Sequence, residues 1–482
     1  MRQLFYIILL SFIVTPTIGF GQNEDDAFRF SNFQTLGSAR FNSMSGAFTA
    51  LGGDPSAIHF NPAGLGVMRR SEFSFSPYLS FNSNEATHLG NRATDFDVDA
   101  KFGNVAIVLA SQPRGGNKWR QSNFGITFNK LIDYNNSFTV SGVNNAGSLL
   151  DVYRQDIENG YFGTYGSDLA WQAYLVDTTT YNGPLEYYTQ IPNYGQQQKN
   201  IVTTKGDLRE TLFSYGANYD DILYIGASVG LLRLRYERNS YFEEVVASND
   251  STTYLDNYSI TDNLNSSGNG VRASLGFIYR PTNYLRIGAS IQSPGVLSIT
   301  DSYRSSVYAE YDSNFTISYA PDPGLFDYSV KTPSRVNAGM AFIFGKYGLL
   351  SFDYQLTDYS SMVLRSRPRS VYSFDTENSI ISTYYTNQHR FALGAESRYG
   401  AFSFRAGATY QSNALTDANL NDYSSFTCSF GAGYRKEHFY ADLGVVSMTS
   451  TQKYYIYDPA FIEASTIRFN TLSFSLSVGL RF

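Results

Sequence analysis

The sequence predicts a transmembrane antiparallel β-barrel of about fourteen strands with a short helical N-terminal plug in its lumen. Three observations lead to this prediction: segments in which apolar and polar residues alternate, a regular succession of short and long polar connections, and an aromatic, charge-poor composition. Phenylalanine (37) and tyrosine (39) supply most of a 16% aromatic content, and only 16% of the residues are charged, against roughly a quarter in ordinary soluble domains.

The composition also excludes other classes of protein. A mean hydropathy of −0.25 is too polar for a bundle of membrane helices, and after residue 20 no apolar run approaches the roughly 18 residues that a spanning helix needs. A formal net charge of −6 gives no indication of nucleic-acid binding, which calls for a basic patch. The single cysteine, Cys428, excludes an internal disulfide and a thiolate zinc site. Because it shares its phase with Phe426 and Phe430, we expect it to face lipid.

Residues 1–21 are predicted to be a cleaved signal peptide. Arg2 is the charged start, residues 4–14 are the apolar core, and Gly19-Phe20-Gly21 is a small-x-small cleavage site. The alternative, an N-terminal membrane anchor, needs a longer apolar stretch. The mature chain is therefore expected to be exported.

Residues 22–70 do not alternate and are predicted to form the plug. Apolar residues at helical spacing indicate a helix over residues 43–51. Asp54-Pro55 and Asn61-Pro62 each predict the start of a short helix, and Gly64 is expected to end the second one. The alternative is a loose periplasmic tail, but the apolar residues of this segment require burial, and they are Phe41, Met44, Phe48, Leu51, Ile58, Phe60 and Leu65.

Residues 71–482 are predicted to form the barrel, and its last strand has the clearest pattern. From residue 471 to Phe482, apolar residues alternate with small or polar ones, as expected for a strand between lipid and lumen. The same alternation upstream places Arg286, Arg335 and Arg405 on the lumen side. A chain that ends on an aromatic residue resembles the C-terminal signal of the bacterial barrel assembly machinery, which is therefore an expected partner through Phe482.

The connections between strands alternate between short turns and longer polar connections. Six short turns and seven longer connections join fourteen strands, so the chain is predicted to enter and leave the barrel on the side of the short turns, which is periplasmic in outer-membrane barrels. One strand changes phase near Leu231, and either a β-bulge or an irregular strand end would explain the change. The short turns are expected at 113–118, 218–221, 280–283, 345–348, 398–400 and 435–437, and the longer connections near 84–97, 135–205, 241–266, 300–330, 365–386, 412–422 and 450–468.

One motif in the plug is specific. The run from Met44 to Leu65, with the triplet Asn61-Pro62-Ala63, resembles the hatch motif of the FadL/TodX family, outer-membrane transporters of long-chain fatty acids and other hydrophobic compounds. The resemblance is strong over residues 37–80, is limited to architecture elsewhere, and fails in the long loops. The opening run 25–31 resembles the Bacteroidetes branch of that family.

The resemblance implies passive transport of hydrophobic small molecules through a plugged barrel, with a lateral exit into outer-membrane lipid. It places both termini in the periplasm of a Gram-negative cell. Residue by residue, the resemblance carries over only the triplet Asn61-Pro62-Ala63. The neighbouring His59, Phe60 and Gly64 complete the candidate hatch and gating residues, although a packed or solvated role is favoured for His59. The alternative is a barrel that acts as a partner or anchor for exported proteins, as type IX secretion accessories do.

No catalytic site, cofactor or metal site is predicted. The four histidines, His59, His88, His389 and His438, lack metal-type spacing. The alternating carboxylates Asp95, Asp97 and Asp99 are oxygen ligands suited to Ca²⁺, but a solvated strand face is the favoured interpretation. The loop 135–205 carries aromatic residues that either receive a substrate or partner or pack over the barrel mouth, and packing is favoured; they are Trp171, Tyr174, Tyr187, Tyr188 and Tyr194.

Overall fold

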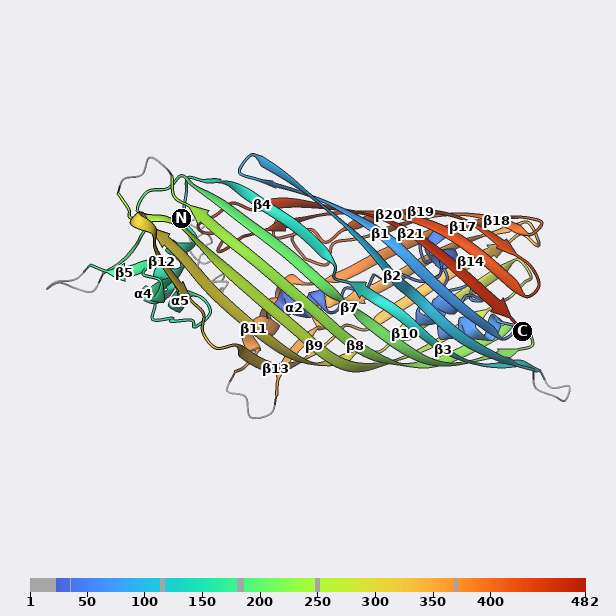
Figure 1. The fold of residues 1–482 in the computed structure, drawn as a ribbon. Helices are drawn as coiled ribbons and strands as arrows, with labels where there is room; N and C mark the ends of the chain where they lie inside the picture. Colours follow the sequence, from blue (N-terminus) through green and yellow to red (C-terminus); the bar gives the residue numbers. More distant parts are fainter. Residues whose placement is uncertain (1–22, 35, 113–117, 180–185, 248–251, 368–371) are drawn as a thin grey trace, which may run out of the picture.

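The computed structural model describes residues 23–34, 36–112, 118–179, 186–247, 252–367 and 372–482; the predicted signal peptide lies outside them. The described residues form a closed antiparallel barrel of fourteen wall strands with a helical N-terminal segment inside it (Figure 1). The barrel closes because the first strand, β1 (Glu72–His88), pairs with both β2 (Asn91–Ser111) and the last strand, β21 (Ser465–Arg481). The predicted fold class is confirmed.

Four of the wall strands are interrupted and carry two labels each. These are β3 (Trp119–Asp133) with β4 (Asn136–Asn144), β10 (Leu285–Gln292) with β11 (Val296–Tyr311), β13 (Gly324–Lys331) with β14 (Arg335–Ile343), and β15 (Gly348–Asp358) with β16 (Val363–Ser366). The remaining wall strands are β7 (Gln196–Tyr219), β8 (Leu223–Val245), β9 (Leu255–Tyr279), β17 (Asn387–Tyr399), β18 (Phe402–Gln411), β19 (Ser425–Arg435) and β20 (Phe439–Tyr454).

The connections at the two ends differ in length. At the end that holds the C-terminus, tight turns join β7 to β8, β9 to β10, β14 to β15, β17 to β18 and β19 to β20, as predicted; the turn predicted at 113–118 lies largely outside the described residues. The longer connection predicted over residues 84–97 is wrong. Both strands extend through it, and the turn is Leu89-Gly90, with φ of 46° and 82°.

The opposite end carries the helices and strands that lie outside the wall. The long insertion between β4 and β7 holds α4 (Leu149–Glu158), α5 (Ser167–Gln172), β5 (Val176–Thr178) and β6 (Tyr187–Thr189). The other elements at this end are η3 (Asp312–Asn314), β12 (Phe315–Tyr319), η4 (Tyr359–Ser361) and α6 (Asp375–Tyr384). No helix in the described ranges is long and apolar enough to cross a membrane.

The phase change near Leu231 is not a β-bulge. Strand β8 pairs with β7 and β9 without a register shift. Up to Leu231 the apolar residues face outward, and from Leu232 onward they face inward and are buried. The strand stays regular while its environment changes. Between Gly226 and Leu231 its inward residues are small, and Gly226 lies against the backbone of the N-terminal segment. Above Leu231 the inward Leu232, Leu234 and Tyr236 join an apolar cluster in the lumen.

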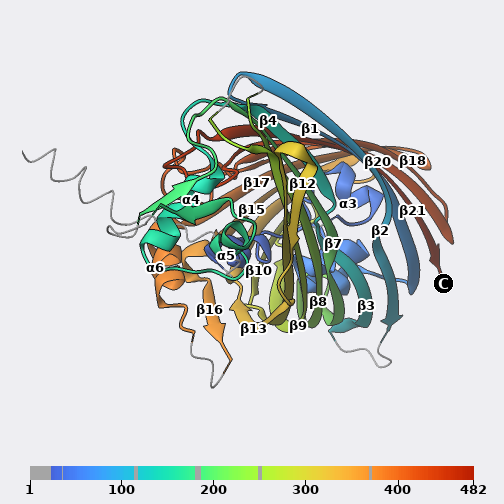
Figure 2. The ribbon, with the colours of Figure 1, turned by 60° about the vertical axis from the view of Figure 1, so that its left-hand side comes forward.

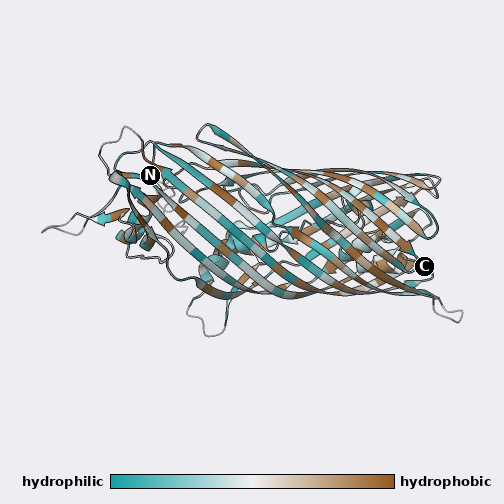
Figure 3. Cartoon of the chain, viewed as in Figure 1, coloured by the Kyte–Doolittle hydropathy of each residue, from teal (hydrophilic) through white to brown (hydrophobic). Residues whose placement is uncertain are grey.

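The outward apolar residues form a band around one half of the barrel. On β8, β9 and β10–β11 this band ends at Leu231, Val271 and Val296, whose side chains are about half exposed. Figure 3 shows that brown, hydrophobic residues concentrate on the strands toward the C-terminal end and teal residues toward the other end. We call the upper edge of this band the rim. Such a band has the character of a lipid-facing surface.

The N-terminal segment lies inside the wall, as Figure 2 shows for the blue helices. It contains α2 (Glu24–Arg29), α3 (Ala39–Ser43), η1 (Pro55–His59) and η2 (Pro62–Val67). The helix predicted over 43–51 is wrong, since α3 ends at Ser43 and turns follow; the glycines there close tight turns that a helix could not make. Gly64 does not end η2, which continues to Val67.

The two predicted helix starts are confirmed. The Asp54 side chain accepts a hydrogen bond from the Ser56 N–H at the start of η1, and the Asn61 side chain accepts one from the Ala63 N–H at the start of η2. In each case the following proline fixes the first turn. We call residues 36–68 the hatch.

Candidate functional site

The hatch rests directly on the wall because glycines of the wall face it. A Cβ on Gly276 would strike the side-chain oxygen of Asn61, and one on Gly226 would strike the backbone of Pro62. A Cβ on Gly407 would lie 2.5 Å from the carbonyl carbon of Met44. Other wall glycines that face the hatch in this way are Gly216, Gly288, Gly339, Gly394, Gly431 and Gly444. The glycine-rich composition therefore provides a seat for the hatch backbone.

Asn61 is the centre of the hatch. Its side-chain Nδ2 donates to the carbonyl of Thr49, at 2.8 Å, and to the carbonyl of Phe277 on β9, at 3.0 Å. Its Oδ1 accepts from the Ala63 N–H at 3.0 Å. One buried amide thus joins two turns of the hatch to each other and to the wall.

The other predicted hatch residues surround Asn61. Phe60 packs on Phe41, with ring centroids 5.3 Å apart, and its carbonyl accepts hydrogen bonds from two wall side chains, Ser290 and Asn337. Pro62 lies against Gly226, Ala63 packs with Tyr224 and Ile278, and the Gly64 carbonyl accepts from the Gly53 N–H. The structure therefore brings the six predicted residues into one contact region between hatch and wall.

His59 is part of a buried ion cluster. Its Nδ1 lies 2.8 Å from Oε2 of Glu210 on β7 and 2.8 Å from Nη2 of Arg272 on β9. Arg272 Nε donates to Glu210 Oε1 at 2.6 Å. Burial, and then the positive charge of Arg272, lower the pKa of His59 to about 4. The ring is therefore neutral at physiological pH and sits between a wall cation and a wall anion.

A second ion cluster holds the other side of the hatch. Arg40 of α3 donates to Glu396 of β17 at 2.9 Å, and the same carboxylate accepts from Arg405 of β18 at 2.7 Å. Arg405 also donates to Asp442 of β20 at 2.6 Å. The side chains in this cluster are at most 8% exposed. Removing one member of such a buried network typically costs about 3–5 kcal/mol, because its partner is left charged and unpaired.

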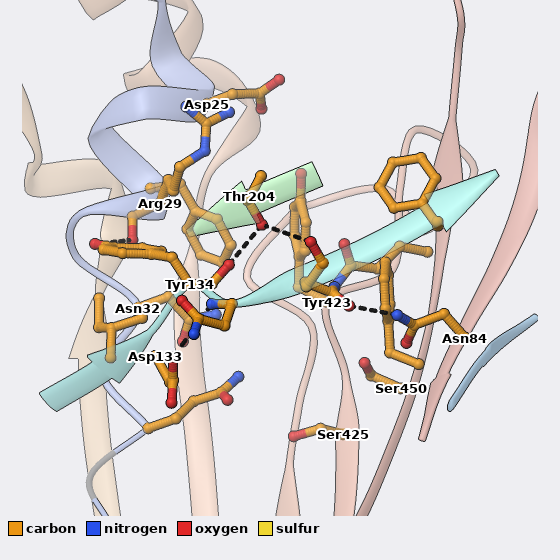
Figure 4. A pocket seen from close by; sticks show the side chains of 18 of the residues that line it. Asp25, Arg29, Asn32, Asn84, Asp133, Tyr134, Thr204, Tyr423, Ser425 and Ser450 are labelled. Atoms are coloured by element: carbon orange, nitrogen blue, oxygen red, sulfur yellow. Dashed lines mark hydrogen bonds between the residues drawn. The ribbon is translucent and has the colours of Figure 1, made fainter. Parts of the chain in front are cut away.

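A cavity of about 910 Å³ lies in the lumen between the hatch and the outer end of the barrel. Phe41, Phe60 and Gly46 of the hatch line one side, and Leu149 and Tyr153 of α4 line another. Figure 4 shows Arg29 and Asn32 of the N-terminal segment on one side of this space and Asn84 of β1 on the other. Its size is suitable for a small organic ligand, because such sites occupy about 300–1,000 Å³.

The α2 helix stands in this lumen within an aromatic cluster. Phe28 lies 4.4 Å from Tyr423 and 5.0 Å from Tyr359, between ring centroids, and Phe30 packs edge-on against Tyr134 and Tyr236. Burial within the barrel, and then the neighbouring Asp25 carboxylate, raise the pKa of Glu24 to about 7. The lining of the cavity thus combines aromatic rings with charged and amide groups.

One part of the wall beside this cavity has no backbone ladder. Strand β2 pairs with β3 only from Asn104 to Ser111, and its upper half pairs only with β1. Strand β4 pairs only with β7. We call the boundary between the upper half of β2 and β3–β4 the seam. Within the described part of the chain, no backbone pairing crosses it.

Side chains close the seam. Lys101 Nζ lies 2.8 Å from Asp133, Asn135 donates to Asp99 at 2.9 Å, and the Thr139 N–H and hydroxyl donate to Asp95 at 2.6 and 3.0 Å. At its base, the Gln34 N–H donates to the Leu131 carbonyl at 2.8 Å, and Leu36 forms a bridge with Lys130. The N-terminal segment is therefore bonded to the edge of β3 at the point where the ladder ends.

Sequence reasoning missed the partners of the hatch. Alternation placed Arg335 and Arg405 on the lumen side, and both are buried there. Nothing in the local pattern paired His59 with Glu210, because 151 residues separate them. Glu210 is a carboxylate on the inward phase of its strand, between Leu208 and Leu212, and such an inward acid is the signal that could have indicated a bound cation.

The remaining predicted residues have other roles. Asp95 and Asp99 accept hydrogen bonds across the seam from Thr139 and Asn135. Within the described ranges no group of three His, Cys, Asp or Glu residues is arranged to hold a metal ion. His88 contacts Ser465, and His389 contacts Tyr354. In the long loop, Trp171 packs edge-on against Phe162 and Tyr187, whereas Tyr174 is 60% exposed. The favoured packing role therefore holds for part of the loop.

Solved structures share this architecture. A Pseudomonas aeruginosa FadL homologue is 13% identical, covers 94% of this chain and 100% of its own, and has a TM-score of 0.56. The Pseudomonas putida toluene transporter TodX is 13% identical, covers 93% of this chain and 99% of its own, and has a TM-score of 0.53. A second structure of that transporter is 15% identical, with 94% and 100% coverage and a TM-score of 0.52.

No family model and no curated protein matches the sequence. The likeness to the two transport proteins therefore establishes the fold, and the resemblance read from the hatch motif is confirmed at that level. It extends over nearly the whole length of each chain.

Proposed function

We propose that this chain is an outer-membrane channel that carries hydrophobic small molecules from the outside into the lumen cavity and releases them sideways through the seam. One observation carries the proposal: the cavity borders a stretch of wall that is closed by side chains alone, with Asp133 and Asn135 of the seam among its lining residues. The shared fold with a toluene transporter and a FadL homologue supports the same class of cargo.

The outward apolar band places the barrel in a membrane, and its alternation with a polar lumen is typical of the outer membrane. In this proposal the periplasmic end of the barrel is the one with the tight turns, where the chain enters β1 and leaves β21. The helices and long connections then face outside. Lateral release is physically reasonable, because each CH₂ group that moves from water to hydrocarbon gains about 0.8 kcal/mol.

The hatch is the gate in this proposal, with His59, Phe60, Asn61, Pro62, Ala63 and Gly64 as its contact region. Leu36 joins the hatch to the edge of β3, so a shift of the hatch pulls directly on the seam. Ligand in the cavity touches Phe41 and Phe60. Occupancy of the cavity, hatch position and seam opening are thereby coupled through one continuous segment.

A covalent lock across the seam tests this function. In a Cys428→Ser background, Asp95→Cys with Thr139→Cys places two thiols where the native side chains touch. Oxidation is expected to abolish uptake of labelled toluene and oleate by cells that express the protein, and reduction is expected to restore it.

The matched control is Ala106→Cys with Thr127→Cys, which joins β2 to β3 where they already share a ladder. Its oxidation should leave uptake unchanged. Equal uptake by the locked and unlocked seam would exclude lateral release there, and equal uptake by a deletion strain would exclude the transport function.

A second candidate function is docking of an exported protein on the outer loops. Exposed apolar side chains gather on these loops, including Tyr161 (65%), Tyr174 (60%) and Tyr254 (74%), and such surfaces mark partner sites. Changing these three tyrosines to serine would then reduce secretion of a partner and leave toluene uptake intact. If the protein is a channel only, the same triple serine variant should show no secretion defect.

A further inference from the structure

We propose that three arginines on the outer surface of the barrel bind the phosphates of a diphosphorylated glycolipid, the anchor of lipopolysaccharide. They are Arg209 of β7 and Arg233 and Arg235 of β8, and we call them the rim arginines. The inference rests on the proposed function only for the membrane location and for which end faces outside.

The rim arginines lie immediately above the apolar band. Along β8 the outward residues run from Val229 and Leu231, both about half exposed, to Arg233 and Arg235, which are exposed, while Leu232 and Leu234 face inward and are buried. Two residues of a strand span about 7 Å. The guanidinium groups are therefore at the height where the headgroups of a lipid begin if its acyl chains cover Leu231.

Their charges are poorly compensated by the protein. Arg209 and Arg233 are directly opposite each other in the β7–β8 ladder, and like charges in that position destabilise a sheet unless a counter-charge joins them. Among the described residues, Arg233 and Arg235 form no ion pair. Arg209 contacts Asp207 at 2.6 Å. The three guanidinium groups thus have one carboxylate beside them, Asp207, which contacts Arg209 and lies opposite Arg235 in the ladder. Glu237, the next acid along β8, already accepts from Asn239.

The neighbouring side chains select the kind of anion. Arginine binds phosphate through two parallel N–H donors. On β9 the residues beside Arg233 and Arg235 are Asn269 and Ser267, both exposed, and Ser298 of β11 follows across the ladder. These amide and hydroxyl groups are suited to the hydroxyls of a sugar. On a glycolipid placed at the rim, the phosphates would contact the arginines, the sugar hydroxyls would contact the amide and hydroxyl groups, and the acyl chains would cover the apolar band.

The outer surface also supplies a control. Arg304 of β11 is exposed, points outward and has no ion pair within the described ranges, but it lies eight residues beyond Val296. That separation corresponds to about 26 Å along the strand, beyond the reach of a headgroup at the rim. Arg304→Ala removes the same charge from the same face without touching the proposed site.

The test is binding of defined lipids to the purified full-length barrel in detergent. Diphosphoryl lipid A, monophosphoryl lipid A and inorganic phosphate are titrated against the native protein, the triple variant R209A/R233A/R235A and Arg304→Ala. We expect the triple variant to bind diphosphoryl lipid A at least tenfold more weakly, monophosphoryl lipid A to bind native protein less tightly, and Arg304→Ala to behave as native. Unchanged binding by the triple variant would overturn the proposal, as would displacement of the lipid by phosphate at equal concentration.

Two further measurements separate this site from the transport function. The triple lysine variant keeps the charge and loses the two-pronged geometry, so an affinity between native and triple alanine is expected; native affinity would overturn the arginine-specific mode. Toluene uptake into phospholipid vesicles that contain no lipid A should be the same for native and triple alanine protein. Lipid binding without any uptake would refute transport alone, and uptake without rim-dependent lipid binding would refute the glycolipid site alone.

Discussion

Asn61 gives the hatch its shape through contacts that no other residue type can reproduce. Replacement by alanine removes two donors to carbonyl groups and the cap of η2. Since the Thr49 carbonyl is buried and the bond to the Phe277 carbonyl is partly buried, the expected cost is about 1–3 kcal/mol of hatch stability. Single-channel conductance of Asn61→Ala in planar bilayers should rise, with more frequent open events.

The control for this change is Asn104→Ala. Asn104 is equally buried and faces the lumen, but it bonds to Asn129 of the wall instead of the hatch. Similar conductance in both variants would mean that loss of any lumen amide opens the channel and that Asn61 has no special part in holding the hatch.

The His59 cluster makes the hatch sensitive to acid. The pKa of His59 in the folded protein is about 4, below the ordinary value of 6.5. As the pH falls, His59 therefore takes up a proton more readily when the hatch has left its seat than when the hatch is in place. The stabilisation by neutral His59 is complete above about pH 6.5 and is lost as the pH falls toward 4. Channel conductance should therefore increase over this window.

His59→Gln removes the titrating ring while retaining a group that can bond to Glu210. Its conductance should be higher at neutral pH and flatter between pH 6.5 and 4. An acid-dependent rise of native size in this variant would assign the pH response to another group.

For single residues, the sequence predicted the hatch side of each contact between hatch and wall but not the wall residue that completes it. The triplet 61–63 and the caps Asp54 and Asn61 could be read directly, because a cap is a local device. Arg272 could not be assigned to His59, since the two are 213 positions apart in the sequence and the strand pattern shows only that Arg272 faces inward.

The wall glycines act as one element, a surface without side chains that receives the hatch backbone. Gly276→Val places a branched side chain where Asn61 now lies. We expect the hatch to leave its seat while the barrel still closes. Limited proteolysis should then cleave residues 36–68, and the heat-modifiable mobility of a folded barrel should persist on gels.

Gly163→Val is the matched change, since a Cβ at this position meets nothing within 4 Å. It should leave the hatch resistant to protease. If Gly276→Val were equally resistant, the hatch would have room to adjust, and the glycines would not define its position.

Elements were predictable where lipid dictates the pattern. Alternation and turns located the lower halves of the strands, because each residue there faces either hydrocarbon or a polar lumen. The phase change at Leu231 was assigned to either a β-bulge or an irregular strand end, and neither is present. The inward face of the upper half of β8 packs on the segment around α2, a partner that only the folded chain reveals. The turns at 44–51 were misread as a helix because apolar spacing cannot distinguish a helix from a turn held by glycine seats.

The whole molecule is divided at the rim into two environments. Leu275 within the band is 60% exposed and Leu325 beyond the rim is 74% exposed. Leu275→Arg should destabilise the inserted barrel by about 2–4 kcal/mol, the cost of arginine near the bilayer midplane, whereas Leu325→Arg should be close to neutral.

Reversible unfolding in phospholipid vesicles measures both changes. The comparison is direct, because the two leucines are similarly free of protein contact and differ in their position relative to the band. Equal destabilisation would show that the rim is misplaced, and with it the height assigned to Arg233 and Arg235.

The inversion of the lumen above Leu231 also has a consequence for the order of assembly. The apolar cluster around Phe28 and Phe30 draws on residues from Leu131 to Ala414, so its contacts span most of the chain and can be made only after nearly every strand is in place. Although α2 is near the beginning of the polypeptide, it must settle late. During biogenesis the barrel therefore passes through a stage in which the wall strands are pairing while α2 has not yet docked in the lumen. The docking of α2 would then be a slow final step, and it would determine when a newly made channel becomes closed.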